Sequence, residues 1–284
     1  MPRFLLITIF DPIYGMNYHF SKPSLQLSPW VKQYWGLESC VPLGSEHIQR
    51  IVPNGLMELM FYLGNRPVSL DRNKPILENT IVSGQQREKY DLQITGNMNL
   101  FSVTFQPQGA MMFFDIPISE CYDQNIPLRF LIKGQTDELE TRLSESACFA
   151  DKIPIVENFL LQQLKRNFKK YDADRISKVI RCVNQTRGRI SVGNLASEAC
   201  LSKKQFERTF AGCIGASPKH FLRVVRFQHA IYNKQKKPNS RLSDLSYDCG
   251  FYDPAHMNNE FKALSGLTPA EFFTGCEAYS DYFS

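Results

Sequence analysis

An internal repeat near the C-terminus constrains this 284-residue chain more than any other feature. Residues 192–199 carry apolar or small side chains at i, i+3, i+4 and i+7, the spacing of one helix face, and residues 242–249 repeat that spacing 50 positions later. A turn and a second helical pattern follow each copy. The repeat predicts two helix-turn-helix units, at about 192–213 and 242–265, joined by a helix over about 218–234.

Capping signals mark the start of the second helix in each unit. Ser202 followed by Gln205 has the spacing of a capping box. Asp253 can cap the other helix, with Pro254 at the first helical position, where its missing N–H costs nothing. Phe206 and Phe210 then face inward, which leaves short and basic side chains facing outward. Such a helix suits the major groove of DNA, where the base edges present a readable pattern of donors and acceptors.

These residues resemble the AraC/XylS family of bacterial transcription regulators. The matching signature spans about 100 residues in family order: Ser202-x-x-x-Phe206-x-Arg208-x-Phe210, Gly215-x-Ser217-Pro218-x-x-Phe221, Gly250-Phe251-x-Asp253, and Phe261-Lys262-x-x-x-Gly266-x-Thr268-Pro269-x-x-Phe272. The resemblance implies that two recognition helices enter successive major grooves on one face of double-stranded promoter DNA. RNA polymerase and a second copy of the chain are further partners of the kind this family engages.

The resemblance places the DNA contacts on the outward positions of the two recognition helices and on basic residues of the connecting helix. The candidates are Ser202, Lys203, Lys204, Glu207, Arg208, Arg223, Arg226, Asp253, Pro254, Ala255, His256, Asn258 and Asn259. Asn259 departs from the family, which usually has a basic residue there. Asparagine can still bind adenine, but it carries no charge to attract phosphate.

Charge is unevenly distributed along the chain. Residues 1–170 carry 17 basic and 17 acidic side chains, whereas residues 186–241 carry 12 basic and 2 acidic, a net charge of +10. Residues 242–284 carry 1 basic and 7 acidic, a net charge of −6. Because the basic segment coincides with the first helix-turn-helix unit and the connecting helix, we expect it to attract DNA phosphates.

The first 130 or so residues show short alternating runs bounded by turns, the pattern of a small barrel or double sheet. Four stretches resemble the cupin-like sensor domain found ahead of AraC-type domains: the region of Trp35, Arg50–Leu63, Gly84–Tyr90 and Phe105–Ala110. The predicted fold class is α+β, a mainly-β cupin-like barrel with trailing helices followed by an all-α double helix-turn-helix domain. The trailing helices either mediate dimerisation or cap the barrel.

The predicted domains are a sensor domain over 1–166, a polar linker over 167–174 and a DNA-binding domain over 175–276. Four polar or amphipathic residues lie near apolar strands of the sensor domain: Arg50, Glu58, Tyr62 and Arg87. They are candidates for lining the barrel interior and holding a small-molecule effector. The alternative is that they face solvent or cap strand ends.

No catalytic motif is found, so the chain is not predicted to be an enzyme. It lacks Gly-x-Ser-x-Gly, a phosphate-binding glycine loop and His-Glu-x-x-His. The eight cysteines form no C-x-x-C, and the N-terminal histidines form no His-x-His, so neither a metal nor a cofactor is predicted. Reduced cysteines and the absence of a membrane-spanning apolar stretch favour the cytoplasm.

Two functions therefore remain open. The first is a DNA-binding regulator controlled by a ligand or partner at the N-terminal barrel. The second is a cupin-like small-molecule-binding or enzymatic protein whose helical half serves only for interaction. A DNA-binding assay distinguishes these two functions.

Overall fold

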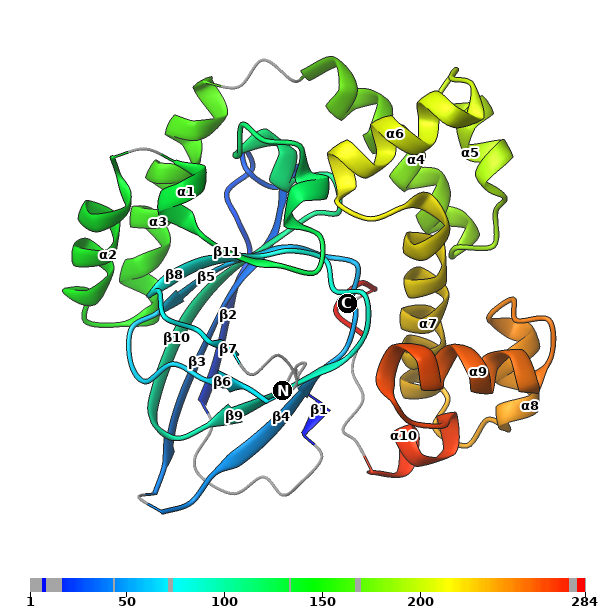
Figure 1. The fold of residues 1–284 in the computed structure, drawn as a ribbon, viewed down its shortest axis with the longest axis horizontal. Helices are drawn as coiled ribbons and strands as arrows, with labels where there is room; N and C mark the ends of the chain where they lie inside the picture. The colour runs from blue at the N-terminus through cyan, green and yellow to red at the C-terminus, as the bar shows by residue number, and fades with distance from the viewer. Residues whose placement is uncertain are drawn as a thin grey trace.

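The computed structural model describes residues 7–8, 17–42, 44–70, 74–132, 134–166, 170–275 and 280–283. Two β-sheets form the centre of the view in Figure 1, with helices α1 to α3 on one side and α4 to α10 on the other. The residues near the C-terminus lie between the sheets and the long helix α7. Figure 1 thus agrees with the predicted α+β class, a mainly-β N-terminal region followed by a helical C-terminal region.

The strands pair antiparallel in two sheets. The five-stranded sheet has the order β1 (Ile7–Thr8), β4 (His47–Ile51), β9 (Tyr90–Ile94), β6 (Val68–Ser69) and β7 (Lys74–Pro75). The six-stranded sheet has the order β11 (Asn125–Pro127), β8 (Thr80–Ser83), β5 (Glu58–Tyr62), β10 (Gly96–Phe105), β3 (Val31–Val41) and β2 (Asn17–Ser21).

Both faces of the six-stranded sheet are covered, as the alternation of side chains along its strands requires. On β10, Met98 and Leu100 point toward the other sheet, and Phe101 points to the opposite face. The ring of Phe101 lies 5.3 Å from that of Phe149 in α3 (Phe149–Arg166). A Cβ on Gly36 would lie 2.8 Å from the Phe149 ring, so the small residue at position 36 permits this close approach.

Ten α-helices and two short 3-10 helices are described. Before the helix-turn-helix units come η1 (Ala110–Met112), η2 (Ile118–Cys121), α1 (Leu128–Leu131), α2 (Thr136–Ser144), α3 and α4 (Lys170–Thr186). The first unit is α5 (Val192–Glu198) and α6 (Lys203–Ile214), and the connecting helix is α7 (Pro218–Lys236). The second unit is α8 (Leu242–Asp248) and α9 (Pro254–Ser265), and α10 (Pro269–Gly275) follows. Both predicted units and the connecting helix are therefore present.

The predicted linker needs a correction. Helix α4 begins at Lys170, so residues 170–174 are helical rather than an open connection, while residues 167–169 lie outside the described part of the chain. The polar composition of 167–174 suggested a loop, but Ala173 and Ile176 already belong to a buried helix face. The domain limits proposed from the sequence otherwise stay predictions.

Local capping chemistry fixes where the recognition helices begin. The Ser202 hydroxyl accepts a hydrogen bond from the Gln205 N–H, and the Gln205 side chain accepts one from the Ser202 N–H, which completes the predicted capping box. The Asp253 carboxylate accepts a hydrogen bond from the His256 N–H at 2.6 Å, with Pro254 in the first turn. Both predicted caps are confirmed.

The two helix-turn-helix units turn at equivalent positions. Cys200 has φ of 53° in the first turn, and Gly250 has φ of 78° in the second. In each unit the next N–H reaches back five residues, from Leu201 to the Ala196 carbonyl and from Phe251 to the Ser246 carbonyl, both at 3.0 Å. A left-handed residue at this position thus shapes both turns, although the first unit uses a cysteine for it.

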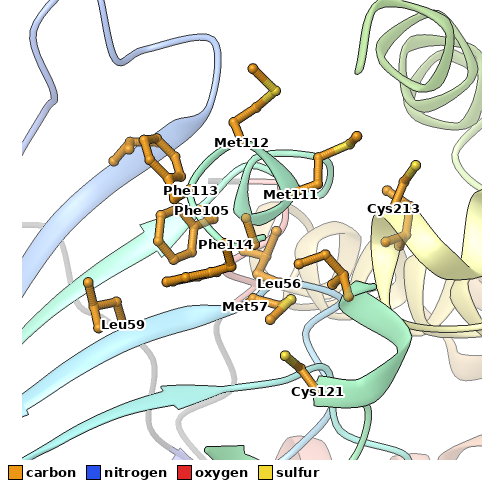
Figure 2. Packing of buried hydrophobic residues seen from close by; sticks show 14 of the residues in the cluster. Leu56, Met57, Leu59, Phe105, Met111, Met112, Phe113, Phe114, Cys121 and Cys213 are labelled. Carbon is orange, nitrogen blue, oxygen red and sulfur yellow. The ribbon is translucent and has the colours of Figure 1, made fainter. Parts of the chain in front are cut away.

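The hydrophobic core crosses from the β-domain into the first helix-turn-helix unit. One buried cluster contains strand residues together with Met111, Cys121, Cys213 and Ile214, and Figure 2 shows the first three at this junction. The second unit has a separate cluster around Phe227 and Phe261 of α7 and α9. The first unit thus shares the large core of the β-domain, whereas the cluster of the second unit includes a residue of the β-domain at Val52.

Candidate nucleic-acid interface and sensor cavity

The first recognition helix, α6, buries one face and exposes the other. Phe206 and Phe210 are fully buried. The candidate DNA-contacting residues on its other face are all exposed: Ser202, Lys203, Lys204, Glu207 and Arg208. No hydrogen bond or ion pair ties Lys203, Lys204 or Arg208 to another described residue. The basic side chains of α6 are therefore available to a ligand outside the protein.

The second recognition helix, α9, exposes uncharged side chains over its first turns and a single lysine, Lys262, in its last turn. Pro254, Ala255, Asn258 and Asn259 are exposed, whereas Asp253 and His256 are only partly so. The last two belong to the helix start. Besides the N-cap bond, the His256 Nδ1 accepts a hydrogen bond from the Tyr252 N–H at 3.2 Å.

The two arginines predicted on the connecting helix have internal partners. The Arg223 Nε donates a hydrogen bond to the Glu260 carboxylate of α9 at 2.8 Å. Arg226 donates to the Gly188 carbonyl at 3.0 Å, and burial lowers the pKa of its guanidinium. Arg223 and Arg226 therefore both tie α7 to its neighbours.

A cavity lies between the two sheets. The space between its walls is about 790 Å³, and this volume includes the part that is open to solvent. Side chains of β3, β4, β5, β8, β9 and β10 line it at alternating positions, and most of them are apolar. Its mainly apolar walls with a few polar groups are typical of a small-molecule site.

Two of the four residues predicted to line this cavity do so, and two do not. Glu58 and Tyr62 both face it from β5. Arg50 was predicted wrongly, because on β4 the neighbours Gln49 and Ile51 point inward and Arg50 points outward. There its guanidinium makes two hydrogen bonds of 2.8 Å to Asp91 on β9.

Arg87 was also predicted wrongly. It is exposed in the segment between β8 and β9, outside the cavity lining. Its backbone N–H donates to the Asp123 carboxylate at 3.2 Å. Gln86 in the same segment lines the cavity, whereas its neighbour Arg87 is exposed.

Glu58 has the most unusual environment in the cavity. Its carboxylate accepts hydrogen bonds from the Ser102 hydroxyl at 2.8 Å and from the Trp35 indole N–H at 3.2 Å. Burial raises the pKa of the Glu58 carboxyl to about 7, although the two hydrogen bonds partly oppose the shift. Burial likewise raises the pKa of the neighbouring Tyr62 hydroxyl.

The wall of the cavity continues into contacts with the helix-turn-helix units. Ser83, Gly84 and Gln86 line the cavity at the end of β8. Next to them, the Gln85 side-chain amide donates to the Ile214 carbonyl at the end of α6, at 2.9 Å. The Gln86 carbonyl lies 3.4 Å from the Nε2 of His220 in α7. These glutamines were not predicted, since nothing in the local sequence marks them.

The C-terminal residues 280–283 form a second connection that the sequence did not predict. The Asn54 amide donates to the Asp281 carboxylate at 3.1 Å, and the Tyr282 hydroxyl donates to the Asn184 side chain of α4 at 2.7 Å. The Lys32 ammonium donates to the backbone carbonyls of both Asp281 and Tyr282. This C-terminal segment thus contacts the barrel and the helical half together.

Two further observations limit the chemistry. Among the described residues, no three His, Cys, Asp or Glu side chains gather as a metal-binding group would require. None of the described helices combines the length and the apolar character that crossing a membrane demands.

Two family models match separate parts of the chain. Residues 195–275 match the helix-turn-helix domain family, and residues 19–127 match a family described as a domain of unknown function, DUF6597. The first match includes both recognition helices, and the second includes most strands of the two sheets.

Curated relatives are similar over part of their length. The probable transcriptional regulator LumQ of Photobacterium leiognathi is 25% identical over 142 residues, 47% of this chain and 56% of the relative. The transcriptional activator RhaR of Escherichia coli is 26% identical over 148 residues, 48% of this chain and 51% of the relative. The matched region thus spans about half of each relative. An uncharacterized helix-turn-helix transcriptional regulator of Haemophilus influenzae is 30% identical over 94 residues, 33% of this chain and 31% of the relative.

Among solved structures, ToxT from Vibrio cholerae aligns with a TM-score of 0.46 and 10% identity, over 93% of this chain and 99% of the other. The family matches and the observed pair of helix-turn-helix units bear out the resemblance seen in the sequence. The chain is therefore similar to the helix-turn-helix domain family over residues 195–275 and to the DUF6597 family over residues 19–127.

Proposed function

We propose that the protein is a sequence-specific DNA-binding transcription regulator whose N-terminal cavity binds a small-molecule effector. The observation that carries the proposal is the exposed row of Lys203, Lys204 and Arg208 on α6, which has no described partner inside the protein. It lies in a segment of net charge +10, within a domain type that its relatives use as transcriptional regulators.

The exposed residues of α6 have the chemistry for reading base edges. Arg208 can donate to both acceptors of a guanine, and Glu207 can accept from the amino group of a cytosine. Lys203 and Lys204, at the start of the helix, can neutralise phosphates. Ser202 already bonds within its capping box, so it contributes mainly by fixing the start of the helix.

The second recognition helix would contribute differently. Pro254 and Ala255 offer apolar contact to a thymine methyl group, and Asn258 and Asn259 can pair with adenine. No exposed Lys or Arg stands among these four residues, and the region around them is acidic. Arg223 and Arg226 would influence DNA binding by orienting α7 and α9, since both already have partners.

An effector could control DNA binding because one segment of the chain both lines the cavity and contacts the helical half. A ligand that shifts Ser83 or Gln86 also shifts the contacts of Gln85 with α6 and of Gln86 with α7. A ligand alters DNA binding only through a difference in its affinity for the two arrangements. The proposed binding partner is promoter DNA. The proposal also includes contact with RNA polymerase, assembly of two copies of the chain into a homodimer, and a location in the cytoplasm.

The test is selection of DNA duplexes from a random pool by the purified protein, followed by gel-shift measurement of the selected sequence. Arg208→Ala should weaken binding at least several-fold. Arg142→Ala, an exposed arginine on α2, is the matched control and should have no effect. Sedimentation of the protein alone and with DNA would report whether it binds as one copy or two.

A cupin-like protein whose helical half serves only for interaction is the alternative function. It is distinguished by the same experiment, because such a protein enriches no duplex and shows no difference between the two arginine variants. The cavity would then be its functional centre, and a ligand would still bind there.

A further inference from the structure

We propose that the effector is a protonated amine attached to a compact apolar body, with its ammonium group beside Glu58. The inference rests on the proposed function for its biological meaning, but binding of such a molecule is measurable without DNA. It is drawn from the charge, the aromatic lining and the unpaired polar atoms of the cavity.

The cavity has one carboxylate and no basic side chain among its described lining residues. An anionic ligand would therefore lose its hydration without gaining a cationic partner, which is costly in a buried site. His47 lies on the same strand face as the lining residue Gln49, but burial lowers the pKa of its ring and so disfavours its charged form. The electrostatics of the cavity thus favour a cation over an anion.

Aromatic rings surround the carboxylate. Trp35, whose indole N–H donates to Glu58, lines the cavity together with Tyr62 and Tyr90. The faces of such rings attract cations, and the attraction grows when water is excluded. The remainder of the lining is mostly aliphatic, including Leu37, Ile94 and Leu100, and suits the apolar body of the ligand.

Unpaired polar atoms also point to a ligand that donates hydrogen bonds. Gln49 is completely buried in the cavity wall, and neither atom of its amide has a partner of normal hydrogen-bond geometry in the described structure. The side-chain oxygen of Asn125, another lining residue, is likewise buried and unpaired. Because buried polar groups are nearly always satisfied, a bound ammonium would supply the donor that these two oxygens lack, whereas the Gln49 Nε2 would need a separate acceptor.

A second carboxyl group, that of Asp281, lies close to Glu58. The buried Asp281 carboxyl lines a small adjacent cavity together with Glu58, and burial, together with the nearby Glu58, raises the pKa of Asp281 well above its usual range. Lys32, beside Asp281, offsets one of the two carboxylates when both are ionised.

The experiment compares matched ligands that differ only in their polar group. The first set is 1-aminoadamantane, 1-adamantanol and 1-adamantanecarboxylate, and the second is 2-phenylethylamine, 2-phenylethanol and 3-phenylpropanoate. Dissociation constants are measured by isothermal titration calorimetry with the full chain at pH 8, where both amines are largely protonated. In at least one set the amine should bind at least tenfold more tightly than the alcohol, and the carboxylate should bind most weakly.

Glu58→Gln removes the charge and keeps the shape, and it should weaken amine binding at least tenfold while changing alcohol binding less than threefold. Glu38→Gln, a partly exposed carboxylate on β3, is the matched control and should change neither. The comparison of ligands on the unaltered protein needs no variant, so it holds even if Glu58→Gln disturbs folding.

The proposal is overturned if an alcohol or carboxylate binds as tightly as its amine, if the folded Glu58→Gln protein keeps full amine affinity, or if none of the six ligands binds at millimolar concentration. Gel shifts with the selected DNA are measured on the same preparations. DNA binding without amine binding rejects this inference alone, whereas amine binding without DNA binding rejects the proposed function and leaves the ligand class standing.

Discussion

Gln228, in the middle of α7, donates a hydrogen bond of 2.8 Å from its side-chain amide to the carbonyl of Pro53, 175 residues earlier in the chain. Pro53 lies between Val52 and Asn54, which both line the sensor cavity. Helix α7 carries a helix-turn-helix unit at each end. One buried hydrogen bond thus connects the rim of the cavity to the helix that sets the spacing of the two units.

Replacing Gln228 with methionine should test this connection. The side chain is buried, so the loss of its hydrogen bond should lower the free energy of unfolding by about 1 kcal/mol. Urea denaturation measures this change. Lys219→Met, at an exposed position on the same helix, should change stability by less than about 0.5 kcal/mol. Equal effects of the two substitutions would show that the bond contributes nothing.

The two turns make opposite predictions for glycine. Cys200→Gly should stabilise the protein by about 0.5–1 kcal/mol, because relief of the left-handed strain exceeds the entropic cost of glycine. Gly250→Ala should destabilise it by about 1–2 kcal/mol, since it adds strain at φ of 78° and a Cβ 2.4 Å from the Arg189 side chain. Thermal unfolding of both variants is the measurement, and a destabilised Cys200→Gly would contradict the strain argument.

Stability should depend on pH through Glu58. Its pKa is raised from 4.5 to about 7 in the folded state, so its contribution to stability is fully present below pH 4.5 and is lost as the pH rises to 7. Glu58→Gln should therefore be more stable than the unaltered protein at pH 8, by at most roughly 3 kcal/mol, with little difference at pH 4.5. Urea unfolding at both pH values checks the sign, and a variant less stable at pH 8 would show that the carboxylate is favourably solvated.

Sequence reasoning succeeded where the signal was local. The capping box of Ser202 and Gln205 depends on residues three positions apart, and both helix starts followed from such patterns. Glu58 stood out as a charge within an apolar strand. It lines the cavity because strand alternation places it on the same face as Tyr62.

Prediction from the sequence failed for residues whose hydrogen-bond partner is distant along the chain. The direction of Arg50 depends on the pairing of β4 with Asp91 on β9, and without that pairing either face of the strand was open to it. Gln228 and Asp281 bond to residues 175 and 227 positions away, so no local pattern marked them. Such long-range contacts appear only once the two halves are packed together.

DNA affinity should fall steeply with salt. The segment 186–241 has a net charge of +10, and if about five phosphates are neutralised, the plot of log K against log salt should have a slope of roughly −4 to −5. Gel shifts or fluorescence anisotropy between about 50 and 200 mM salt give this slope. Lys204→Ala should reduce its magnitude by about 1, and a flat response would remove DNA binding as the function.

The last prediction concerns how much each of the two recognition helices contributes to DNA binding. Helix α6 exposes Lys203, Lys204 and Arg208, whereas the exposed surface of α9 offers Asn258 and Asn259. The nearby Glu260 is already paired with Arg223, so that arginine does not add its full charge to the α9 surface. Phosphate attraction and direct base reading should therefore be concentrated on the half-site that α6 contacts.

Arg208→Ala should cost about 1–3 kcal/mol of binding free energy and relax specificity at one base pair, because a bidentate contact to guanine is lost. Asn259→Ala should cost less, and Asn258→Ala less still. Each variant is measured on the selected operator and on operators scrambled in either half-site. If scrambling the α9 half-site weakens binding as much as scrambling the other, or if Asn259→Ala costs more than Arg208→Ala, the two helices share recognition equally despite their different charges.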